Sequence, residues 1–246
     1  MPPAAELDER WTRTAPAARV REFLVCGVLG PCMDLYTRRR VRGRERLKEV
    51  EGPVVLVANH ASHMDTPALL RALPGKRRRR TAVAAAVDYF YTKRRNALAA
   101  SLVFGTVPVD RDGGGLSEDA TGHLRDWVDS GGTLLMFAEG TRTNDSKVGR
   151  LKSGAAVLAA QQEVPLVPVY VSGTSEAMPR GHHWMVFRDR RPWGTRHPIE
   201  IRFGEPMRPA EGEEPGDTME RVRLFLAESG AATEPDPRVA RTREPV

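Results

Sequence analysis

Residues 54–73 read Val-Val-Leu-Val-Ala-Asn-His-Ala-Ser-His-Met-Asp-Thr-Pro-Ala-Leu-Leu-Arg-Ala-Leu. The first five residues form an apolar run without polar alternation, which is typical of a β-strand buried on both faces. A polar loop follows, and Thr66-Pro67 is a typical start for a helix, which we expect over Pro67–Leu73. This stretch therefore predicts a strand, a polar loop and a helix in succession.

The same alternation recurs over the next hundred residues. Apolar runs that predict strands lie at Ala82–Val87, Val107–Val109, Thr133–Phe137 and Leu166–Val171, and stretches that predict helices lie at Lys93–Val103, Leu116–Val128 and Gly154–Gln162. Buried strands that alternate with helices predict an α/β fold with a mainly parallel central sheet covered by helices. We also expect an edge strand at Ile199–Phe203 and a last helix at Asp217–Ala227.

The chain has 246 residues, of which 40% are hydrophobic and 28% are charged. This length suits one compact domain and is short for two, so we expect a single domain over residues 20–228. In this prediction residues 1–19 form an N-terminal extension, and residues 229–246, rich in Ala, Pro and charge, form a disordered tail. The 22 glycines and 19 prolines follow no regular period, which excludes fibrous classes.

Two features of the N-terminal region bear on the compartment. Cys26 and Cys32 are too few for a disulfide framework or a four-thiolate zinc site, and the first twenty residues mix acids and bases where a secretory signal needs an apolar segment. We therefore expect a reducing, cytoplasmic environment.

The apolar run Phe23–Met33 is about half of the ~20 residues that span a bilayer, and Pro31 interrupts it. We expect a helix there, either buried or lying in a membrane interface.

The formal net charge of +6 is unevenly distributed. Residues 38–48 hold seven basic side chains and one acidic one, and Lys76–Arg80 adds five basic side chains in a row. From Glu205 onward, ten acidic residues face six basic ones. Basic patches favour polyanions, and the charge alone does not choose among nucleic acid, anionic lipid and phosphorylated small molecules. Runs of basic residues also commonly form solvent-exposed surfaces that bind no ligand.

Polar loops follow three of the predicted strands. They cover Asn59–Pro67, Asp110–Asp112 and Ala138–Arg142. Ligands of open α/β sheets bind at the carboxyl ends of the strands, so one site could draw on all three loops. In the first loop, a turn could place Asp65 beside His60, where the carboxylate would fix the imidazole tautomer and leave the other nitrogen to take a proton from a hydroxyl. Alternatively, His60 ends a strand and Asp65 caps a helix, without chemistry.

Four sequence blocks, in order, resemble the glycerolipid acyltransferase family, which includes the 1-acylglycerol-3-phosphate acyltransferases. They are Asn59-His-Ala-Ser-His-Met-Asp65 (the His-x4-Asp signature), Gly105-Thr-Val-Pro-Val-Asp-Arg111, Phe137-Ala-Glu-Gly-Thr-Arg142 and Val164-Pro-Leu-Val-Pro-Val169. The third block departs from the family in having Ala138 where proline is frequent. One block alone is a weak signal, whereas four in order are a strong one.

The resemblance implies transfer of a fatty acyl group from acyl-CoA or acyl carrier protein to a hydroxyl of a lysophospholipid such as 1-acylglycerol-3-phosphate. It makes His60 the general base and Asp65 its orienting partner. The residues that it implies for binding the phosphorylated acceptor are Arg111, Glu139, Gly140, Thr141 and Arg142, and Lys152 lies where similar proteins place a basic residue. Glu139 could equally pair with Arg142 and hold the loop. The scheme needs no metal and no cofactor beyond the thioester co-substrate.

Lipid substrates imply contact with a membrane. We expect peripheral binding to the anionic inner face of the cell membrane, with Phe23–Tyr36 supplying an apolar face and residues 38–48 supplying positive charge. Nucleic acid is not expected, because aromatic residues are scarce and no recognition motif accompanies the arginines.

Two other functions remain open from the residues. A metal-dependent hydrolase would use His60, His63 and Asp65 with His182 and His183, although this spacing matches no common zinc pattern. A basic polyanion-binding module would use the arginine blocks. A serine hydrolase is less favoured, because the chain has no Gly-x-Ser-x-Gly.

Overall fold

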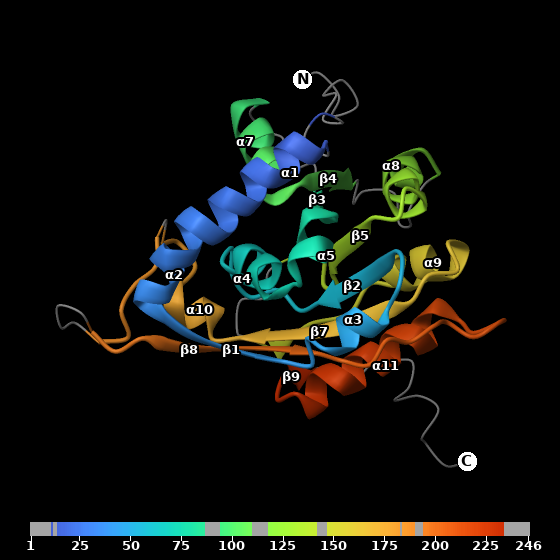
Figure 1. Cartoon of the computed structure of the whole chain (residues 1–246). Helices are drawn as coiled ribbons and strands as arrows, with labels where there is room; N and C mark the ends of the chain where they lie inside the picture. Colours follow the sequence, from blue (N-terminus) through green and yellow to red (C-terminus); the bar gives the residue numbers. More distant parts are fainter. Residues whose placement is uncertain are drawn as a thin grey trace, which may run out of the picture.

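The computed structural model describes residue 11 and residues 14–86, 94–109, 118–141, 147–182, 184–189 and 194–233. In these residues a seven-stranded sheet runs in the order β1-β8-β7-β2-β5-β3-β4 (Figure 1). Its strands are β1 (Thr37–Arg42), β2 (Val54–Ala58), β3 (Thr81–Ala86), β4 (Thr106–Val109), β5 (Thr133–Phe137), β7 (Leu166–Ser172) and β8 (His197–Phe203). The strands from β7 to β4 are mutually parallel, while β8 pairs antiparallel with β7 and parallel with β1. The predicted α/β fold with a mainly parallel sheet is confirmed.

The central strands lack polar alternation because both faces of the sheet are covered. Every residue of β2 is buried. Val54, Leu56 and Ala58 belong to one hydrophobic core, and Val55 and Val57 belong to the other. The two cores therefore lie on opposite faces of one sheet, as expected when helices cover both.

The helices divide between these two faces. They are α1 (Ala15–Glu22), the π-helical turn η3 (Phe23–Leu29), α2 (Gly30–Tyr36), α3 (Arg46–Glu49), α4 (Asp65–Ala72), α5 (Gly75–Arg79), α7 (Arg94–Phe104), α8 (Glu118–Asp129), α9 (Gly154–Gln161), α10 (Thr174–Ala177) and α11 (Pro215–Glu228). Residues of α4 and the N-terminal helices join the core with Leu56, whereas residues of α8, α9 and α11 join the core with Val55. Figure 1 shows these two groups on either side of the sheet.

The N-terminal helices α1, η3 and α2 follow one another without a break and form one long rod (Figure 1). Arg21 is buried against the end of α7, where its guanidinium donates to the carbonyls of Ser101 and Leu102. Farther along, Asp34 accepts two hydrogen bonds from Arg71 of α4, at 2.8 and 2.9 Å. The rod is thus held against the helices that cover this face. Within the described residues, no helix has the length and hydrophobicity that crossing a bilayer requires.

Three predictions about the periphery differ from the structure. The sequence predicts an edge strand at Ile199–Phe203, but β8 is internal, because β1 pairs along its outer side. Strand β1 was not predicted, since four of its six residues are arginines, which an edge strand tolerates by exposing every second side chain. Helix α1 begins at Ala15, inside the predicted N-terminal extension. Near the other end, Ala232–Thr233 form strand β9, which pairs with β6 (Lys147–Val148) and lies inside the predicted disordered tail. Residues 234–246 lie outside the described part, and the single-domain assignment over 20–228 stays a prediction.

Candidate active site

The candidate site lies where the parallel strands β2 and β5 end. Ala58 and Phe137 are register partners at the carboxyl ends of these two strands. The next backbone hydrogen bond joins the amide of Ala138 to the carbonyl of Ala58, at 2.9 Å. His60 and Glu139 therefore emerge side by side at the sheet edge where open α/β folds bind ligands.

The turn after β2 brings His60 and Asp65 together. The His60 Nδ1 and Asp65 Oδ2 atoms are 2.9 Å apart. The same carboxylate oxygen accepts the backbone N–H groups of Ala61 at 2.7 Å and Ser62 at 2.8 Å. Asp65 is fully buried and begins helix α4, so its carboxylate is held by the turn that it closes. An acidic group in the first helical turn is also favoured by the helix dipole.

The imidazole of His60 stacks on the ring of Phe137, with the ring centroids 3.9 Å apart and the planes 20° apart. With Nδ1 directed at Asp65, proton exchange with a ligand falls to Nε2. A carboxylate at Nδ1 fixes the tautomer and stabilises the imidazolium that forms when Nε2 takes a proton. The side chain keeps 16% of its surface exposed, so a substrate can reach it. This pair has the geometry of a general base and its orienting carboxylate.

Asn59 and Ser62 anchor the His60 turn to the neighbouring strand β7 and the segment after it. The buried Asn59 amide donates to the carbonyl of Val171 at 2.9 Å and accepts its N–H at 2.8 Å. The Ser62 hydroxyl donates to the carbonyl of Met178 at 3.0 Å. We did not predict these positioning roles, nor the stacking of Phe137. The only sequence signal for them was the presence of polar residues within the His-x4-Asp block.

The carboxylate of Glu139 binds two backbone amides from separate segments. Its Oε1 atom accepts the N–H of His60 at 2.8 Å, and its Oε2 atom accepts the N–H of Gly149 at 3.1 Å. Glu139 is 7% exposed, and this burial raises the pKa of its carboxyl above the ordinary value, although the two amide hydrogen bonds oppose the shift.

Lys152 lies against Gly140. Gly140 adopts a φ of +68°, and a Cβ atom built on it would lie 3.1 Å from both Cε and Nζ of Lys152. The ammonium group thus reaches the loop after β5, beside the exposed Thr141. Of the predicted acceptor residues, the structure brings Glu139, Gly140, Thr141 and Lys152 together, whereas Arg111 and Arg142 lie outside the described residues.

Of the other histidines of the metal-site hypothesis, His63 and His182 lie in the described part of the chain. Within the described part of the chain, no three His, Cys, Asp or Glu side chains are grouped so that they could hold a metal ion. The half-buried His63 is not among the partners that the structure gives to Asp65, and the exposed His182 lies beyond α10. His183 lies outside the described residues. No observation of this structure favours the metal-dependent hydrolase.

The arginines of the block 76–80 bond to other segments of the protein. Arg77 donates to the carbonyls of Leu47, Val50 and Gly52 and to the hydroxyl of Thr133. Both Arg78 and Arg79 pair with Glu22 of α1, each at 2.9 Å. These side chains tie α5 to its surroundings, which weakens the argument for a polyanion-binding module.

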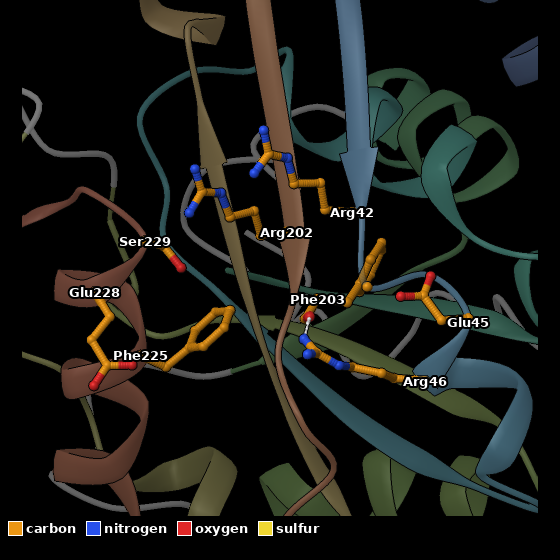
Figure 2. A pocket seen from close by; sticks show the side chains of 9 residues that line it. Arg42, Glu45, Arg46, Arg202, Phe203, Phe225, Glu228 and Ser229 are labelled. Carbon is orange, nitrogen blue, oxygen red and sulfur yellow. Dashed lines mark hydrogen bonds between the residues drawn. The ribbon is translucent and has the colours of Figure 1, made fainter.

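A pocket of about 400 Å³ lies at the far end of the sheet, where β1 and β8 end near the carboxyl end of α11 (Figure 2). Arg42 and Arg202 lie side by side on these strands, and both contact Glu200, at 3.3 and 2.8 Å. Arg46 pairs with Glu205 at 2.7 Å and donates to the carbonyl of Phe203. Each of these arginines has an acidic partner, so we assign no anionic ligand to this pocket.

Known proteins resemble the chain in sequence. A model of the family described as Acyltransferase matches residues 38–172. The 1-acyl-sn-glycerol-3-phosphate acyltransferase BAT2, chloroplastic, of Brassica napus is 28% identical over 152 residues, which are 59% of this chain and 40% of that protein. The 1-acyl-sn-glycerol-3-phosphate acyltransferase alpha of Homo sapiens is 30% identical over 198 residues, 76% of this chain and 61% of that protein. The chain spans about two fifths of the length of the Brassica relative.

A solved structure shares the fold. The 1-acyl-sn-glycerophosphate acyltransferase PlsC of Thermotoga maritima aligns with a TM-score of 0.59 and 20% identity, covering 91% of this chain and 81% of that one. The family match covers more than half of the chain and includes the turn that joins His60 to Asp65. The chain therefore belongs to the acyltransferase family.

Proposed function

We propose that this protein transfers a fatty acyl group from a thioester to the free hydroxyl of 1-acylglycerol-3-phosphate or a close analogue. The observation that carries the proposal is the His60 imidazole, held at Nδ1 by a buried carboxylate and stacked on Phe137 at the carboxyl edge of the sheet. The similarity to 1-acyl-sn-glycerol-3-phosphate acyltransferases supports this acceptor. Both acyl-CoA and acyl carrier protein are candidate donors.

In this mechanism His60 Nε2 takes the proton of the acceptor hydroxyl while its oxygen attacks the thioester carbonyl. The new C–O bond forms, the C–S bond breaks, and the imidazolium returns its proton to the departing thiolate. Asp65 stabilises the imidazolium between these steps. A positioned base of this kind contributes typically about 10²–10⁴-fold. No acyl-enzyme intermediate and no metal enter the scheme.

The phosphate of the acceptor is proposed to bind at the loop after β5. The Lys152 ammonium lies against Gly140 there, and the exposed Thr141 follows. Arg111 and Arg142 complete this proposed anion site, because planar guanidinium groups bind phosphate in a bidentate manner. The backbone N–H groups of Ala61 and Ser62 are engaged by Asp65, so the oxyanion donors are to be sought elsewhere in the site.

We also propose that the protein works as a peripheral protein on the cytoplasmic, inner face of the cell membrane. Along the N-terminal rod, Val20, Phe23, Val28 and Leu35 are 46%, 66%, 43% and 39% exposed. Val20 and Phe23 are three residues apart, and Val28 and Leu35 are seven apart, which are spacings at which helical side chains share a face. Transfer of a large apolar side chain out of water is worth about 1.5–3 kcal/mol. Basic residues near an anionic leaflet add about 1 kcal/mol each.

The function is tested by offering the purified protein acyl-CoA and acyl carrier protein thioesters with a panel of lysophospholipids and glycerol 3-phosphate. We expect thiol release that depends on 1-acylglycerol-3-phosphate, with phosphatidic acid as the product. Thiol release that yields only free fatty acid, whatever the acceptor, would contradict acyl transfer and favour a hydrolase.

Membrane binding is tested by flotation with vesicles that contain an anionic phospholipid. A Phe23→Ser, Val28→Ser double variant should bind at least about tenfold more weakly, because two exposed apolar side chains are lost from the rod. The matched control is Leu224→Ser, which removes a side chain 48% exposed on α11. Equal binding by the wild type and the double variant would contradict the proposed face.

A further inference from the structure

The hydrogen-bond ladder between β2 and β5 is continued by a side chain. The last backbone bond of the ladder joins the Ala138 N–H to the Ala58 carbonyl. One step farther on, the partner of the His60 N–H is the Glu139 carboxylate, at 2.8 Å. The backbone that carries the imidazole is therefore fixed by a residue 79 positions away in the sequence.

The other oxygen of Glu139 reaches the segment that carries Lys152. It accepts the N–H of Gly149 at 3.1 Å. Three residues later, the N–H of Lys152 donates to the carbonyl of Ala138 at 2.8 Å, and the Lys152 side chain lies against Gly140. One carboxylate thus connects the turn of the proposed base with the segment of the proposed phosphate-binding lysine.

We propose that Glu139 is a positioning residue, which fixes the His60 main chain and the 147–152 segment in one geometry, and that it does not serve as a ligand of the acceptor. The inference rests on the proposed function in assigning roles to His60 and Lys152. The tether itself is a property of the fold and can be tested without any reaction.

The chemistry of the two contacts explains why glutamate is suited to this position. Two N–H groups from different segments need two acceptor atoms, and an ionised carboxylate offers one on each oxygen. Hydrogen bonds to an ionised acceptor are stronger than neutral ones. A glutamine would accept one N–H and turn its own NH₂ group towards the other donor. Burial raises the pKa of the Glu139 carboxyl and disfavours its charged form, whereas the hydrogen bonds from the two amides favour the charged form.

Amide hydrogen exchange tests the tether directly, in the full-length protein without substrate. In Glu139→Ala, exchange at His60 and at Gly149 should both accelerate by about tenfold or more, because each loses a charge-assisted hydrogen bond. In Glu139→Gln at least one of the two amides should do so, because the side chain keeps only one acceptor oxygen. The matched control Glu205→Gln, at an acidic residue paired with Arg46, should leave both amides unchanged. Unchanged exchange at His60 and Gly149 in both Glu139 variants would overturn the inference.

Kinetics separate positioning from acceptor binding. A misplaced base predicts that kcat of Glu139→Gln falls by about 10–100-fold. Any rise in the KM for 1-acylglycerol-3-phosphate should not exceed that of Lys152→Ala, because Glu139 also holds the segment of Lys152. Slow thioester hydrolysis by water, without acceptor, should fall in parallel. A rise of tenfold or more in the acceptor KM, with kcat unchanged, would instead identify Glu139 as an acceptor ligand. If the wild type transfers no acyl group, the proposed function fails, and the exchange experiment still decides the tether.

Discussion

Replacement of Asp65 by asparagine removes one charge and leaves the shape of the side chain nearly unchanged. The Asp65 Oδ2 atom lies 2.9 Å from His60 Nδ1 and accepts two backbone N–H groups besides. The amide oxygen of asparagine can occupy the same place and keep these three hydrogen bonds. The variant should therefore fold, and what it loses is the negative charge beside an imidazole that becomes positive during the reaction.

The size of the effect follows from that charge pair. Two unit charges about 4 Å apart attract each other by about 4 kcal/mol at the effective dielectric constant typical of protein sites. This attraction is gained as the proton moves to His60, so it lowers the transition state relative to the ground state. Loss of about 4 kcal/mol corresponds to about a 10³-fold decrease in kcat, since each 1.36 kcal/mol is tenfold.

The assay is acceptor-dependent thiol release, with thermal unfolding as a check on folding. The same chemical change at Asp217, an exposed residue in the first turn of α11, is the matched control and should leave kcat unchanged. A kcat of Asp65→Asn within tenfold of the wild type, in a folded protein, would refute the role that we give to this carboxylate.

Three further predictions concern stability and pH. Gly140→Ala should lower the free energy of unfolding by about 1–2 kcal/mol in urea titrations, because an alanine must adopt a φ of +68° and press on Lys152; an unchanged midpoint would contradict the reasoning. Asn59→Ala should cost about 2–4 kcal/mol, since it leaves one buried N–H and one buried carbonyl of β7 unpaired, and a cost below about 1 kcal/mol would argue against that clamp. The hydrogen bond from Arg71 lowers the pKa of Asp34 below 3.8, so the stability that wild type gains over Asp34→Asn is present at neutral pH and is lost as the pH falls through and below that value. Because the Asp34 side chain is 50% exposed, we expect the gain to be at most about 1 kcal/mol, and a difference that does not shrink as the solution is made more acidic would oppose this origin.

The centre of the fold follows from the sequence because burial on both faces leaves a clear local pattern. Strands β2, β5 and β7 consist mainly of apolar residues, and most of their residues are buried. The outer strand β1 leaves no such pattern, since it exposes every second side chain and reads as a run of arginines. Its pairing with β8 joins segments more than 150 residues apart, which no local pattern encodes.

The candidate site was predictable to the extent that its contacts are local. His60 and Asp65 are five residues apart, so a single turn suffices to join them. The bond from Glu139 to the His60 backbone depends on the register of β2 on β5, and is not visible in the sequence. The arginine runs pointed to a surface for polyanions that the structure does not favour. Arginines such as Arg77 bond instead to backbone carbonyls of the protein itself.

Substitution of the proposed base tests the central claim most directly. Glutamine at position 60 retains a polar side chain but cannot take a proton near neutral pH, and His182→Gln makes the same change at an exposed histidine outside the site. With acyl-CoA and 1-acylglycerol-3-phosphate, we predict that acceptor-dependent thiol release falls by at least about 100-fold in His60→Gln and is unchanged in His182→Gln. Acyl transfer by folded His60→Gln at a rate within twofold of the wild type would contradict the mechanism.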